Sequence, residues 1–297
     1  MRRATGARVQ AEGVGLATRE GPVYTGVGFT ARPGTLTVFR ADSGGGRSAL
    51  LLTLTGRMRP SEGTLYVDGH ALPRHAHRVR RISSLGLMDE VNPLDERLRV
   101  REHLSEGLLL RMRPAARSLA DEAMEAAGLG GLDRRSLVRE LSMLERRRLG
   151  LALALLAEPR LLAVDDVDGG LDPGHQADLW RTLKGLSDDG LTVVATCADS
   201  DELAEVAGPD TQGPIPLRQD AGHPSGSEAA DGGPSAAGTG TGSADAPGGA
   251  GASENRGTGG ASAAAPGTGG RRGRHRRHVG LDILRGGREE GGDRGRA

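Results

Sequence analysis

The sequence predicts an α/β fold with a parallel sheet, and three stretches support this. Residues 35–39 alternate polar and apolar side chains, as a strand does, and a glycine-rich turn and an apolar, helix-like stretch over 48–54 follow. Residues 161–166 form an apolar run ending in two acids, which is typical of a buried parallel strand that carries carboxylates to a sheet edge. Residues 191–196 form a further strand-like run.

The turn after the first strand has the chemistry of a phosphate-binding loop in which an arginine replaces the usual lysine. Three consecutive glycines free backbone N–H groups to surround a phosphate chain, and the helix that follows directs its positive dipole end toward the anion. The guanidinium of Arg47 keeps the positive charge but binds phosphate as a planar fork. A plain glycine-rich turn is the alternative, which the flanking strand and helix disfavour. The expected nucleotide-binding residues of the loop are Ser43, Gly44, Gly45, Gly46, Arg47, Ser48 and Ala49.

The two acids at the end of the second strand suit a metal ion and a proton transfer. The sequence places Asp165 to hold Mg²⁺ opposite the hydroxyl of Ser48. It places Asp166 to orient or deprotonate an attacking water, as a general base. Taken alone, an Asp-Asp pair at a strand end favours turn chemistry or a helix cap.

Composition divides the 297 residues into a folded part and a low-complexity part. Residues 8–207 are sufficient for one well-developed core. Residues 208–270 are Gly, Ala, Ser, Thr and Pro with almost no large apolar side chains, so we predict a disordered linker there. Residues 271–297 form a basic C-terminal tail, whose Arg- and His-rich block over 271–278 suits either a purely solvated segment or contact with an acidic membrane surface or partner.

Charge and cysteine content limit the classes of function. The formal net charge is zero, which gives no general argument for nucleic acid or lipid as a partner. Cys197 is the only cysteine, so an intramolecular disulfide is excluded, a reducing cytoplasmic setting is predicted and the thiol is expected to be buried filler. No uncharged apolar run is long enough to span a bilayer, so any membrane role requires a partner. Lys184 is the sole lysine among 39 Lys and Arg residues, which suggests a GC-rich, actinobacterium-like genome.

Four motifs follow one another in a fixed order: the loop at 41–48, Leu-Ser-Met-Leu-Glu at 141–145, the strand segment 158–166 and Gly-Gly-Leu-Asp-Pro at 169–173. Together they resemble the ATP-binding subunit of ATP-binding-cassette (ABC) transporters over residues 8–205. The resemblance implies a P-loop NTPase (RecA-like) core with a small antiparallel β portion and a helical subdomain inserted at about 85–145. It also implies ATP and Mg²⁺ as ligands, pairing with another cassette in a homo- or heterodimer, and an integral-membrane permease contacted at the inner face of the cell membrane.

The signature motif of that family places a serine and glycine amides at a helix N-terminus, facing the γ-phosphate bound by the other cassette. Ser142 is retained here for that contact in trans. Met143 and Leu144 replace the glycines and Glu145 replaces the glutamine, so we expect side chains where backbone approaches phosphate, and an added negative charge. The arginines of the helix predicted over 145–157 are expected to form a solvated face.

Other positions depart from the family as well. Glu90 aligns with the glutamine that senses Mg²⁺ and is a candidate catalytic residue. Ala198 aligns with the switch histidine, and Asp166 stands where the family has glutamate. Glu20 aligns with the aromatic residue that stacks on adenine, with Tyr24 near enough to replace it.

These departures leave three hypotheses. The first is an ABC-type ATP-binding subunit that drives or gates a permease with weak or no hydrolysis, because losing one positioned donor costs about 100- to 1000-fold in rate. The alternative is a non-catalytic regulatory or structural cassette in a heterodimer. The third, suggested only by the basic tail, is a nucleic-acid-associated cassette protein.

Overall fold

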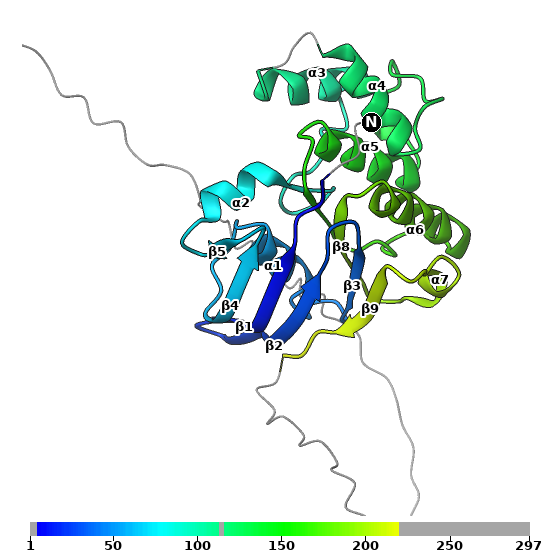
Figure 1. Ribbon diagram of the computed structural model, residues 1–297. Coiled ribbons are helices and arrows are strands. Elements are labelled where there is room, and N and C mark those ends of the chain that lie inside the picture. Colours follow the sequence, from blue (N-terminus) through cyan, green and yellow to red (C-terminus); the bar gives the residue numbers. More distant parts are fainter. Residues whose placement is uncertain (1–4, 113–115, 220–297) are drawn as a thin grey trace, which may run out of the picture. The chain divides into compact units, whose positions relative to one another are not determined.

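The computed structural model describes residues 5–112 and 116–219, which belong to the first of the two units into which the chain divides, residues 1–228 (Figure 1). The predicted basic tail and most of the predicted linker lie outside the described residues. The described part is a mixed α/β structure with two sheets, as the sequence predicted.

The central sheet is parallel, with strand order β6-β7-β8-β3-β9. Its strands are β6 (Ser83–Leu85), β7 (Leu161–Val164), β8 (Thr192–Cys197), β3 (Leu36–Arg40) and β9 (Thr211–Pro216). Every residue of β7 and β8 is buried, because helices cover both faces of such a sheet and apolar side chains are needed on each. All three strands predicted from the sequence are present, each with bounds that differ by one or two residues.

The second sheet is antiparallel, with strand order β2-β1-β4-β5. Its strands are β1 (Val9–Thr18), β2 (Gly21–Ala31), β4 (Glu62–Val67) and β5 (His70–Leu72). One face packs on a hydrophobic cluster that also contains residues of α1 and the parallel sheet, among them Phe39, Leu50 and Leu161. The antiparallel portion implied by the resemblance is therefore present and lies against the phosphate-loop side of the core.

Helices flank the sheets. They are α1 (Arg47–Leu54), α2 (Ala76–Ile82), α3 (Val100–Leu110), α4 (Arg117–Ala126), α5 (Met143–Leu155), α6 (Pro173–Asp188) and α7 (Asp201–Ala204), with a 3₁₀ turn at Val138–Glu140. Helices α3, α4 and α5 gather on one side of the molecule, away from β1 and β2 (Figure 1). Helix α5 extends beyond residue 145, where the helical insertion was predicted to end, and packs against both α4 and β6, so it joins the insertion to the core. No helix in the described ranges is long and apolar enough to cross a membrane.

Strand β9 corrects the predicted domain boundary at 207. Thr211–Pro216 lies inside the range assigned to the disordered linker, yet it pairs in parallel with β3 as an edge strand. Backbone hydrogen bonds to β3 do not require large side chains, and Ile215 and Leu217 pack against the core as partly buried residues. Composition alone missed this strand because its stability comes from a partner far away in the sequence.

Candidate phosphate-binding site

The loop between β3 and α1 has the backbone that its glycines allow. Gly44 and Gly46 have φ of 85° and 82°, the left-handed region that residues with a Cβ avoid. A Cβ on Gly46 would lie 2.7 Å from the carbonyl oxygen of Val23, and one on Gly45 would lie 2.8 Å from that of Asp42. The predicted strand, loop and helix are thus confirmed, and the loop is a tight turn that opens into the N-terminus of α1.

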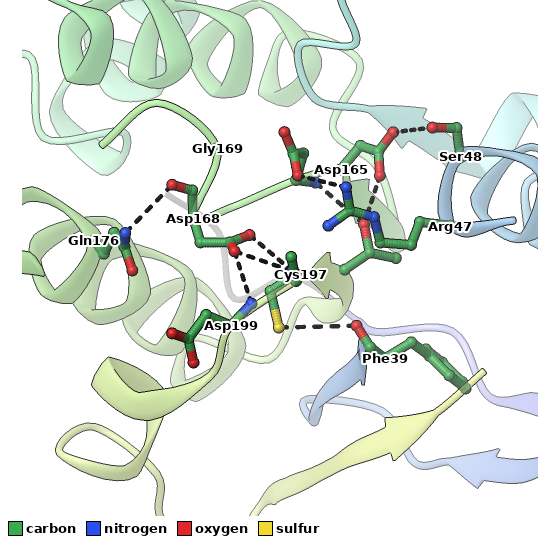
Figure 2. Close-up of polar contacts among 12 residues, drawn as sticks. Phe39, Arg47, Ser48, Asp165, Asp168, Gly169, Gln176, Cys197 and Asp199 are labelled. Atoms are coloured by element: carbon green, nitrogen blue, oxygen red, sulfur yellow. Dashed lines mark hydrogen bonds and ion pairs between the residues drawn. The ribbon is translucent and has the colours of Figure 1, made fainter. Parts of the chain in front are cut away.

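Ser48 and Asp165 are brought together, as predicted, from α1 and the end of β7. The Ser48 hydroxyl donates to Oδ2 of Asp165, and Thr196 donates to Oδ1 over 2.5 Å (Figure 2). Asp165 is buried while Ser48 faces outward. Converging hydroxyl and carboxylate oxygens are the ligands that Mg²⁺ takes when its remaining positions are filled by waters and substrate phosphates, so these residues fit that ion.

Asp166 is held by two arginines. Its Oδ1 lies 2.9 Å from Nη2 of Arg47, and its Oδ2 lies 3.8 Å from Nη2 of Arg147. Asp166 itself has φ of 50° and a side chain that is 41% exposed. The predicted general base is therefore engaged as an ion-pair partner of the loop arginine, a contact that the sequence did not foresee.

The prediction that the α5 arginines form a solvated face is wrong for Arg147. Its side chain is only 13% exposed, because α5 packs against the segment after β7. Its guanidinium donates to the carbonyl oxygens of Asp165 at 3.3 Å and of Gly169 at 2.6 Å. In the sequence, Arg147 is marked only by its position two residues after the signature motif. That position could not predict the contact with Asp166, which depends on α5 packing beside the end of β7.

Asp168 fixes the loop that follows β8. Its carboxylate accepts hydrogen bonds from the backbone N–H groups of Ala198 (3.0 and 3.1 Å) and Asp199 (2.7 Å) (Figure 2). At Ala198, the residue predicted to align with the switch histidine, the carboxylate of Asp168 holds the backbone N–H. Sequence reasoning missed Asp168, although it stands in the same acidic run as Asp165 and Asp166.

The signature segment forms the N-terminus of α5. Ser142 is the N-cap, and the Glu145 carboxylate accepts hydrogen bonds from its backbone N–H and its hydroxyl. Leu144 is buried in the core, so the expectation that its side chain fills the phosphate approach is wrong. Met143, the first residue of α5, is 47% exposed.

The sequence offered two further candidates, Tyr24 for stacking on a base and Glu90 for a catalytic role. Tyr24 is fully buried and donates to Thr53 over 2.8 Å, so it is not available to stack on a base; burial raises the pKa of its hydroxyl to about 12. Glu90 is exposed, and its catalytic role stays a prediction.

Cys197 has the buried role that the sequence predicted. The thiol is fully buried and donates weakly to the carbonyl oxygen of Phe39 (Figure 2). Burial, reinforced by the nearby carboxylate of Asp168, raises its pKa to about 12. The thiolate needed for nucleophilic chemistry is therefore not formed near neutral pH.

The end of the described chain touches the phosphate loop. Leu217 donates its N–H to Arg40, the N–H of Thr25 donates to Arg218, and the side-chain amide of Gln219 donates to the carbonyl oxygen of Gly44 over 2.7 Å. The segment after β9 therefore braces the loop from outside.

The parallel sheet, the glycine loop and the serine–aspartate pair at the strand edge define an α/β protein of the phosphate-loop class. Residues 24–168 match the profile of the family described as ABC transporter. A putative ABC transporter ATP-binding protein of Streptomyces coelicolor is 33% identical over 200 residues, covering 66% of this chain and 70% of that protein. The chain belongs to the family of ABC transporter ATP-binding proteins.

Other relatives match over less of their length. The daunorubicin resistance ATP-binding protein DrrA3 of Streptomyces coeruleorubidus is 34% identical over 61% of this chain and 58% of its own. The sulfate/thiosulfate import ATP-binding protein CysA of Mycobacterium tuberculosis is 32% identical over 61% of this chain and 51% of its own. The match thus spans little more than half the length of these relatives. Among solved structures, cbiO1 from Clostridium perfringens has a TM-score of 0.61 at 21% identity, covering 71% of this chain and 86% of that one, which supports the fold.

Proposed function

We propose that this chain is the ATP-binding subunit of an ABC-type transporter that couples nucleotide binding to a separate membrane permease, with weak or no hydrolysis by its own site. The loop geometry supports phosphate binding by residues 43–49, and Ser48 with Asp165 would hold Mg²⁺. Bound Mg²⁺ would neutralise charge on the phosphates. The names of two relatives include daunorubicin resistance and sulfate/thiosulfate import, which favours a transport role. Contact with a permease would place the chain at the inner face of the cell membrane.

The ion pair between Arg47 and Asp166 carries the proposal of weak hydrolysis. A general base must reach the attacking water with a free carboxylate oxygen. Oδ1 of Asp166 lies 2.9 Å from Nη2 of the loop arginine, so this ion pair must break before Asp166 can act as a base. Ala198 adds no side-chain donor at the switch position. We therefore expect these departures from the family to weaken nucleotide binding less than they lower the rate of hydrolysis.

Binding and turnover are tested separately on the full chain. Equilibrium titration with ATP and Mg²⁺ should show association that Gly46→Asp abolishes, while steady-state hydrolysis should be slow. Association that is absent, or equal in Gly46→Asp, would contradict nucleotide use. Fast hydrolysis that Asp166→Asn leaves unchanged would contradict the role given to Asp166. Recovery of the chain from membranes with a permease would support the partner class, and recovery with RNA alone would contradict it.

A second candidate function is a non-catalytic cassette in a heterodimer. The Glu145 carboxylate occupies the hydroxyl and N–H of Ser142, the groups that the signature would offer to a nucleotide in trans. A mixed dimer whose turnover depends on the partner's acidic residue and not on Asp166 would favour this candidate. Turnover by the chain as a homodimer would exclude it.

A further inference from the structure

We propose that Arg47 and Arg147 together form an anion fork for a terminal phosphate group, and that Asp166 occupies this fork as an internal, displaceable anion. Where the inference concerns the terminal phosphate of ATP, it rests on the proposed function. It assigns Arg147, which no motif marks, as a phosphate-contacting residue in cis at a site where Ala198 offers no imidazole.

The geometry shows one carboxylate between two guanidinium groups. Asp166 presents one oxygen to each arginine, at 2.9 Å from Arg47 and 3.8 Å from Arg147. Gly169 permits this approach, since a Cβ there would lie 2.0 Å from Oδ2 of Asp166 and 2.8 Å from Nη2 of Arg147. Any larger residue at 169 would force these side chains to move.

Two donors of the fork have no partner in the described part of the chain. Nη1 of Arg47 and Nε of Arg147 are buried and make no hydrogen bond. A buried unpaired guanidinium N–H is costly, so it indicates either strain or a missing acceptor. A carboxylate has two oxygens, whereas a terminal phosphate presents three, so the larger anion supplies acceptors that Asp166 cannot.

Differences in burial indicate that the two arginines are fixed and that the side chain of Asp166 can move. Arg47 and Arg147 are each 13% exposed, and Arg147 is also anchored by the carbonyl oxygens of Asp165 and Gly169. Asp166 is 41% exposed, so its side chain can swing toward solvent. The two arginines carry one more positive charge than Asp166 neutralises, which favours exchange for a doubly charged phosphate.

The experiment compares ATP, ADP and inorganic phosphate by calorimetric titration of the full chain with Mg²⁺. ADP reports the loop alone, because it lacks the terminal phosphate. Arg147→Gln should weaken ATP binding about tenfold or more and leave ADP binding within about threefold, as expected for loss of a charged hydrogen bond. The matched control is Arg146→Gln on the preceding position of α5, whose guanidinium pairs with Glu96, and it should leave the ratio of ATP to ADP affinity unchanged.

Asp166→Asn gives the reciprocal test. It should tighten ATP binding about fivefold by releasing the fork, and this gain should vanish in the Arg147→Gln background, as coupled residues require. If Arg147→Gln lowers the thermal unfolding midpoint strongly, Arg147→Lys keeps the charge without the fork and should give an intermediate ATP affinity.

The outcomes are distinct. An ATP-to-ADP ratio that is the same in Arg147→Gln and the natural chain overturns the inference. If neither nucleotide binds the natural chain, the proposed function fails, and the titration with inorganic phosphate then tests the anion fork alone. Phosphate that binds the natural chain but not Arg147→Gln would support the fork, with free phosphate as its ligand. Phosphate binding that is absent, or unaffected by Arg147→Gln, then overturns the inference too.

Discussion

Glu145 accepts two hydrogen bonds from Ser142, one from the backbone N–H at 2.8 Å and one from the hydroxyl at 2.9 Å. The backbone N–H of Glu145 donates back to the Ser142 hydroxyl at 3.3 Å. This is a capping box, which satisfies N–H groups at the start of α5 and places a carboxylate at its positive end. The helix N-terminus that the family directs at a nucleotide thus carries its own anion.

Ser142→Ala should lower the free energy of unfolding by about 1 kcal/mol, because it removes the N-cap acceptor. Glu145→Gln should change it by less than about 0.5 kcal/mol, since glutamine also completes a capping box. Urea unfolding of the two variants makes the comparison. Equal stability of Ser142→Ala and the natural chain would show that the cap contributes nothing.

Ser48→Ala should weaken ATP binding about tenfold in Mg²⁺ and little in the presence of a chelator, because the hydroxyl acts through the metal ion. Ser43→Ala, on the exposed part of the same loop, is the matched control and should not change the Mg²⁺ dependence. Calorimetric titrations with and without Mg²⁺ measure this. A Ser48→Ala effect of the same size in chelator would place the hydroxyl on phosphate instead.

Gly46→Ala should be more damaging than Gly44→Ala, although both glycines have positive φ. The left-handed backbone costs a residue with a Cβ about 1 kcal/mol at either position. At Gly46 the Cβ also meets the Val23 carbonyl at 2.7 Å, whereas at Gly44 it meets nothing within 4 Å. Thermal unfolding should rank the two variants in this order, and the reverse order would contradict the loop geometry.

Asp168→Ala should loosen the segment after β8, because two backbone N–H groups lose their charged acceptor. We expect a loss of about 1–2 kcal/mol in the free energy of unfolding. Amide hydrogen exchange at Ala198 and Asp199 should accelerate more than at residues within β8. Asp168→Asn keeps one acceptor oxygen, so its exchange rates should lie between those of Asp168→Ala and the natural chain. Unchanged exchange at both amides in Asp168→Ala would refute the contact.

Stability should fall as pH rises above the ordinary pKa of tyrosine, and Tyr24 should contribute to that loss. Its pKa is raised from 10.0 to about 12, so the unfolded chain loses this proton first and the folded state becomes less favoured across that window. Tyr24→Phe should make the free energy of unfolding fall less steeply with pH. Some decline should remain in this variant, because Cys197 also has a raised pKa. Urea unfolding across alkaline pH measures the slope, and identical slopes would contradict the assignment.

The sequence identified the elements that depend on local patterns. Alternating and continuous apolar runs located β3, β7 and β8, and the glycine run located the turn before α1. Ser48 and Asp165 could be paired from sequence because a loop before a helix and the end of a parallel strand meet at one sheet edge. The predicted bounds of these strands differ from the observed ones by one or two residues, because hydrogen bonding at a strand end depends on the neighbouring strands.

The phosphate loop and its predicted ligand follow from the sequence itself, since glycine conformation and the strand-turn-helix order are encoded within a few residues. Only the tertiary structure decided which charges face one another: Arg147 beside Asp166, Glu145 on Ser142, and Asp168 on the loop after β8. It also placed β9 in the sheet and Tyr24 in the core. Most of these contacts join residues distant in sequence, and burial and charge pairing arise only when the elements that carry them pack together.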